Sequence, residues 1–353
     1  MDILFIAHNN HQEKYFNILA ENLPFSSKVI RAKFSICNAP KIDLSKKFEE
    51  LNNKYSGPRL ELYKKYLQIE SRLIYCEYKK MIEKYNPKLI GIWNGIKYPQ
   101  FIINEFEVKK IYFENGFLPD TTQADCKGVN ALNSVPREKE FYEKLEYYKK
   151  PLPQKLIPRP PVKKLEGKEI DLNRNYVFIP LQVNYDSQII YFSSWIKSMK
   201  QFFEMINSIA DEFDFDFVFK SHPSDRVTNY KNLIKKAKNN VLFATNPTHE
   251  LIKNAKAIIT INSSVGIESL LFNKKVITLG KAFYNIQGIV KHAKNKEELI
   301  KTLKNLNLWK VNEKLIKNFL GYLYYEYLIP KSWKNPDKKH FEKLTDKISQ
   351  CLR

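Results

Sequence analysis

Polar side chains follow three short apolar runs in the second half of this 353-residue chain, each at the point where a run ends. They are Gln182 and Asp186 after the first run, His222 after the second, and Asn262, Ser263 and Ser264 after a later one. Amides, hydroxyls, an imidazole and a carboxylate are groups that bind phosphates and move protons. They indicate a reactive or binding site if the fold brings them together.

The stretch from Tyr176 to Gly288 supplies the elements that must position these residues. Four apolar runs rich in Val, Ile and Phe recur there, with helix-like segments between them. This alternation predicts βαβ units on a parallel sheet, and therefore an α/β fold. Ligands of such sheets bind outside the carboxyl ends of the strands, so we expect the polar residues to share one edge.

Ser263 and Ser264 directly precede a predicted helix, Val265 to Leu271. Helix N-termini attract anions, and serine hydroxyls add donors, so a nucleotide phosphate fits here. Two serines that simply cap the helix explain the pattern equally well. Glu268 lies one turn further on the same face as Ser264, where it either accepts hydrogen bonds from ribose hydroxyls or faces solvent.

His222 stands between a strand and Pro223, which restricts the turn and places the imidazole at the edge of the sheet. A histidine there can stabilise a leaving phosphate. A single histidine at a strand end is otherwise unremarkable, and its importance comes from the serines expected beside it.

Asp186 and Glu114 are the carboxylates best placed for catalysis, because each follows a strand and they come from different halves of the chain. Sugar transfer uses two carboxylates, one as nucleophile or base and one as acid. Either residue is alternatively a loop cap. Asp214-Phe215-Asp216 matches a D-x-D metal motif, but it lies at the start of a strand, the wrong end for a ligand, so no metal is expected.

The first half has its own alternation of strands and helices and predicts a second Rossmann-like domain. Its first strand, Asp2 to Ala7, ends at His8, which either serves an acceptor site or caps the following helix. No G-x-G-x-x-G motif follows that strand, so dinucleotide binding has no support. A long helix from about Arg59 to Tyr85 carries an aromatic stripe that we interpret as core packing.

A polar loop from Asn115 to Arg137 follows the predicted strand that ends in Glu114. Long loops of this kind in compact domains are usually functional or disordered, and the apolar residues Phe117 and Val129 favour an ordered loop. We therefore expect Asn115 and Asn130, together with His8, on the acceptor side of the site.

The length of the chain predicts more than one domain. We expect an acceptor-side domain over residues 1–150, a proline-rich linker over 151–165, a nucleotide-sugar domain over 166–300, and C-terminal helices over 301–353 that pack at the domain interface. No internal repeat is evident.

Lys and Arg number 59 against 38 Asp and Glu, a formal net charge of +21. This excess favours acidic partners, or it reflects genomic composition. The lysines are dispersed, which argues against nucleic acid.

None of the four cysteines is paired at short spacing, so neither zinc nor a disulfide framework is expected, which suits a reducing cytoplasm. Without a signal peptide or a spanning segment, any membrane contact is expected to be peripheral.

Four segments together resemble the bacterial capsule polysaccharide synthesis family, whose characterised members are retaining β-Kdo glycosyltransferases that use CMP-Kdo. The segments are ENGFLPD…GVNALNSVPR (Glu114 to Arg137), PLQVNYDSQI (Pro180 to Ile189), KSHP (Lys220 to Pro223) and NSSVGIESLLFNKKVITLG (Asn262 to Gly280). They cover about half the chain and come in the family's order. The Glu-x-Gly loop with its Gly-Val-Asn piece discriminates best, since bacterial sialyltransferases carry similar His-Pro and Ser-Ser pieces.

The resemblance implies a GT-B-like pair of Rossmann-like domains facing an interdomain cleft, with no metal or other cofactor. It implies that Asp186 is the nucleophile and Glu114 the acid/base. The implied nucleotide-sugar contacts are Gln182, Lys220, His222, Asn262, Ser263, Ser264 and Glu268. The implied acceptor is a surface glycan or a lipid-linked glycan at the cytoplasmic face of the membrane.

Two other functions stay open at this point. The donor is alternatively another CMP-activated acid, such as sialic acid. A function of a different class is non-catalytic binding of polyanions, with the polar residues at the strand ends being structural; steep salt dependence would favour it.

Overall fold

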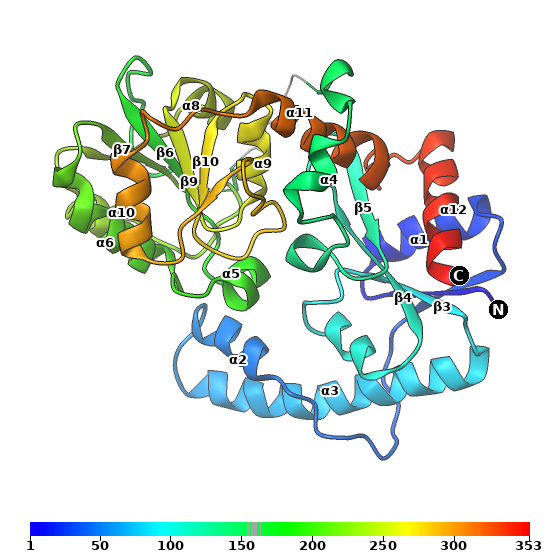
Figure 1. Cartoon of the computed structure of the whole chain (residues 1–353). Coiled ribbons are helices and arrows are strands. Elements are labelled where there is room, and N and C mark those ends of the chain that lie inside the picture. The colour runs from blue at the N-terminus through cyan, green and yellow to red at the C-terminus, as the bar shows by residue number, and fades with distance from the viewer. Residues whose placement is uncertain (154–155, 157–160, 163) are drawn as a thin grey trace. The chain divides into compact units, whose positions relative to one another are not determined.

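The computed structural model describes residues 1–153, 156, 161–162 and 164–353, which form two compact units. Unit 1 comprises Met1–Ser134 together with Tyr327–Arg353, and unit 2 comprises Val135–Glu326. Each unit is built on one six-stranded sheet with helices packed against it (Figure 1). The predicted α/β class, a GT-B-like pair of Rossmann-like domains, is therefore confirmed.

The sheet of unit 1 has the strand order β12-β5-β4-β3-β1-β2. Its parallel strands are β1 (Ile3–Ala7), β2 (Ser27–Arg31), β3 (Leu89–Trp93) and β4 (Lys109–Asn115), and the antiparallel ones are β5 (Thr121–Asp125) and β12 (Ile329–Pro330). The helices are α1 (Asn10–Asn22), α2 (Ser45–Asn52), α3 (Pro58–Tyr85) and α12 (Lys338–Leu352), with short 3-10 turns at Gln100–Glu105 and Asn130–Leu132. All five residues of β1 are buried, as expected for a central parallel strand.

The C-terminal segment completes unit 1. Its strand β12 pairs with β5, and Leu344 and Ile348 of α12 pack into the same core as Phe5. Inside this core, the Tyr15 hydroxyl lies 2.8 Å from Nε2 of His340. Chain ends far apart in sequence therefore build a single core.

The sheet of unit 2 has the order β11-β10-β9-β6-β7-β8, and all its strands are parallel. They are β6 (Tyr176–Pro180), β7 (Asp216–Lys220), β8 (Val241–Phe243), β9 (Ala257–Thr260), β10 (Lys275–Thr278) and β11 (Lys291–His292). The helices are α4 (Lys139–Glu143), α5 (Ser187–Phe192), α6 (Met199–Ile209), α7 (Lys231–Ile234), α8 (Thr248–Asn254), α9 (Ser264–Leu270), α10 (Lys296–Lys304) and α11 (Glu313–Tyr322). Strand order runs outward in both directions from β6 and β9, so the topological switch point lies between them.

The limits of the units differ from the predicted domain limits. Residues 135–150 lie in unit 2, and the predicted C-terminal region 301–353 is divided, its first part in unit 2 and residues 327–353 in unit 1. Residues 154–155, 157–160 and 163 of the predicted linker lie outside the described residues. The expectation of an interdomain cleft stays a prediction.

All four cysteines form disulfides, Cys37 with Cys76 and Cys126 with Cys351, so the prediction of no disulfides is wrong. The partners are 39 and 225 residues apart in sequence, yet the fold brings their Cα atoms to 5.4 Å and 5.9 Å. Short-range spacing cannot reveal pairs of this kind. The cysteines therefore no longer support a reducing compartment. Separately, no helix in the described part of the chain is long and apolar enough to cross a bilayer.

Candidate active site

Gln182 and Asn262 lie at the switch point of unit 2, just beyond β6 and β9. The Gln182 amide Nε2 donates to Oδ1 of Asn262 at 3.0 Å, and both side chains are buried. Asn262 Nδ2 in turn donates to the backbone oxygen of Gln188 at 2.9 Å, at the start of α5. The two amides therefore tie the loop after β6 to the loop after β9 and fix the frame of the site.

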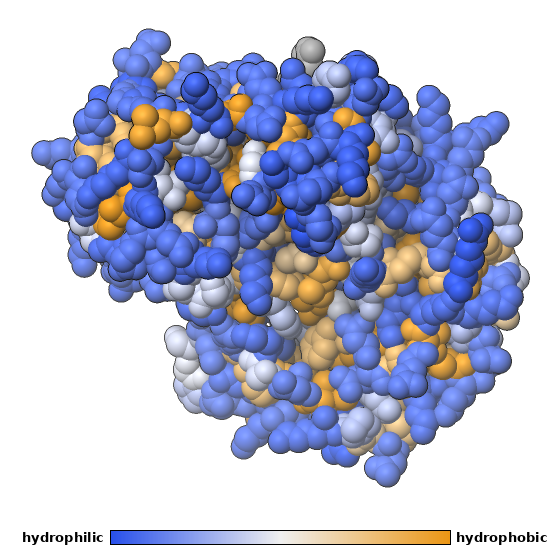
Figure 2. Space-filling model, in the orientation of Figure 1, coloured by the Kyte–Doolittle hydropathy of each residue, from blue (hydrophilic) through white to orange (hydrophobic). Residues whose placement is uncertain are grey.

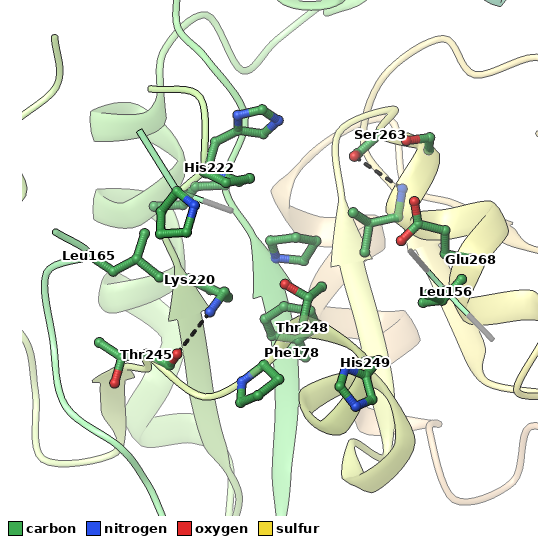
Figure 3. A pocket seen from close by; sticks show the side chains of 17 residues that line it. Leu156, Leu165, Phe178, Lys220, His222, Thr245, Thr248, His249, Ser263 and Glu268 are labelled. Carbon is green, nitrogen blue, oxygen red and sulfur yellow. Dashed lines mark hydrogen bonds between the residues drawn. The ribbon is translucent and has the colours of Figure 1, made fainter. Parts of the chain in front are cut away.

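A pocket of about 310 Å³ opens at the carboxyl edge of this sheet (Figure 3). Five of the predicted site residues line it: Lys220, His222, Ser263, Ser264 and Glu268. They come from the end of β7 and the turn after it, from the loop after β9 and from α9. About 40 residues of sequence separate His222 from Ser263. His222, Ser263 and Ser264, which the edge rule predicts, thus line one pocket together with Lys220, implied by the resemblance, and Glu268, predicted from helix spacing. Gln182 and Asn262 support the pocket's frame and are absent from its described lining.

His222 has a defined hydrogen-bond geometry on one side of its ring. Its Nδ1 accepts from the backbone N–H of Ser224 at 3.1 Å. An Nδ1 that accepts cannot carry a proton, so in this arrangement the ring proton lies on Nε2. His222 thus presents an N–H donor, the group that an anionic phosphate oxygen requires.

Ser263 is the N-cap of α9, because its Oγ accepts from the backbone N–H of Val265 at 3.2 Å. Its backbone oxygen accepts from the hydroxyl of Tyr284 at 2.5 Å. A Cβ on Gly266 would stand 2.5 Å from that hydroxyl, so only glycine allows Tyr284 to reach the turn. The capping role of Ser263 is thus observed, and phosphate binding by Ser263 and Ser264 stays a prediction.

Glu268 follows one turn later and lines the pocket, half-buried. Burial raises the pKa of the neighbouring Tyr284 hydroxyl, and the negative charge of Glu268 raises it further. Tyr284 is therefore a neutral hydrogen-bond donor at neutral pH, which is the form that its bond to Ser263 requires.

Lys220 lines the pocket, yet its ammonium group is directed at the backbone. Nζ donates to the oxygens of Thr245 at 3.1 Å and Asn246 at 2.5 Å (Figure 3 draws the first of these bonds). Burial lowers the pKa of Lys220. The lysine thereby holds the loop between β8 and α8 against β7.

That loop carries residues that sequence reasoning missed. Thr245, Pro247, Thr248 and His249 line the pocket, in the sequence TNPTHE that follows β8. The rule that identified His222 applies to them too, because they also follow a strand end. Apolar residues complete the lining, among them Leu156, Leu165 and Phe178, which give the pocket a surface suited to the face of a base or sugar.

Asp186 is half-buried, caps α5 and is absent from the pocket's described lining. Its Oδ1 accepts from the N–H of Gln188 at 2.9 Å. Because the backbone oxygen of Gln188 is bound by Asn262, the Asp186 cap is anchored to the turn that carries Ser263. The Oγ of Ser221 and Nε2 of Gln188 are buried without a partner among the described residues.

Glu114 lies in unit 1, at the end of β4, and three N–H groups donate to its carboxylate. Oε2 accepts from Asn94 Nδ2 at 2.7 Å, while Oε1 accepts from the backbone and side-chain nitrogens of Asn115, both at 2.9 Å. Asn94 was not predicted. Its signal is Asn-Gly directly after a strand, and its left-handed backbone, φ 64°, is a conformation that asparagine tolerates.

The three predicted acceptor-side residues also lie in unit 1, and each has partners there. His8 Nε2 lies 2.6 Å from the Tyr78 hydroxyl, and burial lowers its pKa to about 4, so it is neutral at neutral pH. Asn115 Oδ1 accepts from the Trp333 indole at 2.9 Å, and the N–H of Asn130 donates to Gln123 at 3.2 Å.

The D-x-D sequence is placed as expected, at the amino end of β7. The Asp216 carboxylate accepts from Arg174 Nε at 2.6 Å. This ion pair already engages the carboxylate. Among the residues that the structure describes, no three or more histidine, cysteine or acidic side chains form a group able to hold a metal.

The chain is similar to several known proteins. A family model described as "Capsule polysaccharide biosynthesis protein" matches residues 144–325. Protein FixF of Sinorhizobium fredii is 33% identical over 294 residues, covering 81% of this chain and 70% of that protein. The capsule polysaccharide export protein KpsS of Escherichia coli is 26% identical over 283 residues, covering 61% of this chain and 70% of its own.

Among solved structures, KpsC of Thermosulfurimonas dismutans, described as a beta Kdo 2,7 transferase, superposes with a TM-score of 0.52. The match covers 100% of both chains at 16% sequence identity. At that identity the likeness concerns the fold.

Proposed function

The chain belongs to the capsule polysaccharide biosynthesis family, and from this premise we propose that it is a glycosyltransferase that moves Kdo from CMP-Kdo to a surface polysaccharide or glycolipid acceptor. In this proposal the reaction retains the anomeric configuration through a covalent carboxylate intermediate, and it needs no metal or other cofactor. It takes place at the cytoplasmic face of the membrane, where the acceptor is assembled.

The pocket at the switch point of unit 2 is the observation that carries the proposal. It lies within the segment that the family model matches, and His222, Ser263, Ser264 and Glu268 line it together. An N–H donor and two hydroxyls suit a phosphate, and a carboxylate suits ribose hydroxyls. The apolar part of the lining suits the face of a pyrimidine. A phosphate, a ribose and a pyrimidine together make up CMP, which is the leaving group of a CMP-sugar.

The proposed first step is displacement of CMP by the Asp186 carboxylate. An oxygen of Asp186 forms a bond to C2 of Kdo, the bond from C2 to the phosphate oxygen breaks, and CMP departs with the electron pair. His222 stabilises the charge that develops on this phosphate. The cap bond from Gln188 uses Oδ1 of Asp186, so Oδ2 is the oxygen that we assign to the attack.

The proposed second step releases the sugar. An acceptor hydroxyl attacks C2, its proton passes to the Glu114 carboxylate, and the ester bond to Asp186 breaks, which restores the aspartate. Hydrogen bonds from Asn94 and Asn115 orient Glu114 for this role. Two displacements at one carbon give net retention.

Intact-protein mass spectrometry after incubation with CMP-Kdo tests the proposal. We expect the wild-type protein to gain the mass of one Kdo residue and Asp186→Ala to gain none. Glu114→Gln is expected to keep the adduct, because the defect falls on the second step.

Absence of an adduct and of released CMP would overturn the Kdo assignment, and CMP-sialic acid is then the next donor to test. Absence of turnover with either donor, accompanied by steeply salt-dependent binding to generic polyanions, would instead support a non-catalytic role.

A further inference from the structure

The N-terminal half of α3 carries apolar side chains on the outside of the protein. Of the eleven large apolar side chains that are exposed among the described residues, seven lie between Phe34 and Ile69. Leu62 is 71% exposed, Tyr66 50% and Ile69 64%. Figure 2 shows hydrophobic residues reaching the surface along the lower part of the view, where Figure 1 draws α3. The interpretation of the aromatic stripe as core packing is therefore wrong for Tyr66, whereas Tyr78 of the same helix is buried.

The exposed residues form a stripe along one face of the helix. Leu62, Tyr66 and Ile69 are four and three residues apart, so they lie one above another. The buried residues of the same helix occupy another face: Leu60, Leu67, Ser71, Ile74 and Tyr78. α3 is therefore apolar on two faces. One packs against the rest of unit 1, and the other is exposed.

A loop extends this stripe at its C-terminal end. The backbone N–H of Ser35 donates to the oxygen of Leu73 at 3.2 Å, and Cys37 is disulfide-bonded to Cys76. These contacts hold the loop on α3 one turn beyond Ile69. Its apolar residues Phe34 and Ile36 are 55% and 92% exposed. We call Phe34, Ile36, Leu62, Tyr66 and Ile69 the α3 stripe.

The charges beside the stripe are predominantly positive. Arg59 and Lys65 are exposed on α3 and make no ion pair within the described residues. The neighbouring acids are already engaged, since Glu61 pairs with Lys64 at 2.6 Å and Glu70 accepts from the hydroxyls of Tyr66 and Tyr98. The stripe therefore combines exposed apolar groups with two cations, Arg59 and Lys65, that pair with no described acid, while Lys64 neutralises Glu61 and Glu70 has only uncharged hydroxyls as partners.

We propose that the α3 stripe docks unit 1 onto an anionic lipid surface. A helix face of Leu, Ile and Tyr flanked by Arg and Lys matches an interfacial helix, whose apolar side chains enter the boundary of the acyl chains while the cations contact lipid phosphates. Five apolar side chains fall short of the roughly 20–30 residues per partner that a stable protein interface uses. This inference goes beyond the proposed transferase activity and does not depend on it.

Sedimentation of the full chain with vesicles tests the proposal. We expect binding to phosphatidylcholine vesicles that contain about 30% phosphatidylglycerol, weaker binding to pure phosphatidylcholine, and loss of the difference at high salt. Leu62→Ser combined with Ile69→Ser should lower the bound fraction about tenfold. Arg59→Gln and Lys65→Gln should each lower it about fivefold, on anionic vesicles alone.

Leu308→Ser is the matched control, because Leu308 is 79% exposed and lies in unit 2, outside the stripe. It should bind as the wild type does. Circular dichroism and thermal melting establish that each variant is folded, and the two charge variants test the proposal independently of the apolar pair.

Three results would overturn the proposal. The first is equal binding of the stripe variant and the wild type, and the second is an equal loss in the Leu308 control. The third is a wild-type dimer in light scattering that the stripe variant converts to a monomer, because the stripe then meets a second copy of the chain.

Discussion

The two sheets use their carboxyl edges differently. In unit 2 the loops after β7, β8 and β9 leave a pocket between them, and His222, Ser264 and Glu268 line it. In unit 1 the polar side chains at the edge bind one another, as Glu114 does with Asn94 and Asn115. One edge has a preformed space for a ligand, and the other has an oriented carboxylate.

Under the proposed function, this difference is a division of labour. A nucleotide offers many fixed groups, so a rigid pocket held by amide and lysine bonds can bind it without reorganisation. A proton-transferring carboxylate needs orientation above all, and the bonds from Asn94 and Asn115 supply it. The following predictions test whether the two edges have these separate roles.

The largest expected effect is the loss of transfer activity on replacing Asp186. Asp186→Asn preserves the cap of α5, because asparagine caps helices as well as aspartate does, but an amide cannot form the sugar ester. We expect transfer to fall by at least about 10³-fold with no loss of stability, measured as CMP release and product formation. Asp337→Asn changes the corresponding cap of α12 and should leave the rate unchanged. Retention of a tenth of the activity would remove Asp186 from the nucleophile's role.

Glu114→Gln should affect the second step of transfer and spare donor binding. We expect the rate of product formation to fall about 10²-fold while the covalent adduct accumulates in the mass spectrum. Asn94→Gly keeps the left-handed backbone but removes the amide that orients Glu114, so a smaller loss, about tenfold, is expected. Weakened CMP binding in either variant would contradict the division between the edges.

Gly266→Ala should disturb the pocket edge through Tyr284. The new Cβ would stand 2.5 Å from the Tyr284 hydroxyl, which must move and release its bond to Ser263. We expect a loss of about 1–3 kcal/mol in the free energy of unfolding and roughly tenfold weaker CMP binding. Tyr284→Phe alone should cost about 1 kcal/mol.

The double variant of Gly266 and Tyr284 decides whether this mechanism is correct. Its loss of stability should be smaller than the sum of the two single losses, because both act on the same contact. Strict additivity, measured by urea unfolding, would show that the alanine acts elsewhere.

Lys220→Met should loosen the loop between β8 and α8. Two backbone oxygens lose their donor, which should lower the free energy of unfolding by about 1–3 kcal/mol. We expect KM for the donor to rise several-fold with kcat unchanged, because the lysine acts through Thr248 and His249. The exposed Lys253 on α8 gives the control, Lys253→Met. A fall in kcat with unchanged KM would point to a direct catalytic role instead.

The smallest predicted effect is the pH dependence of unit 1. Burial lowers the pKa of Lys347 to about 8, although the charge of Asp125 acts in the opposite direction. Between this value and the ordinary lysine value the unfolded chain binds more protons, so stability rises with pH. From pH 7.5 to 9.5 we expect a gain of roughly 1–2 kcal/mol from this group. The gain should disappear in Lys347→Met, and urea unfolding at both pH values measures it; an equal gain in the variant would assign it to other groups.

The sequence by itself determined the α/β class and placed His222, Ser263 and Ser264 at the carboxyl edge, where they line the pocket. Strand periodicity and polar strand ends are local signals, and a parallel sheet brings such ends together whatever the loops do. The same rule applied to the end of β8 would have found Thr248 and His249. The sequence therefore contains the signal for these two residues as well. The Asp186 cap is also readable locally.

Only the tertiary structure decided which groups are already occupied. Lys220 binds carbonyl oxygens of a loop 25 residues away, and Cys126 pairs with a cysteine 225 residues away. The two apolar faces of α3 look alike in sequence, and packing buries one and leaves the other exposed. Partners at such separations are chosen by the assembled fold, because neither spacing nor local propensity encodes which distant group lies opposite.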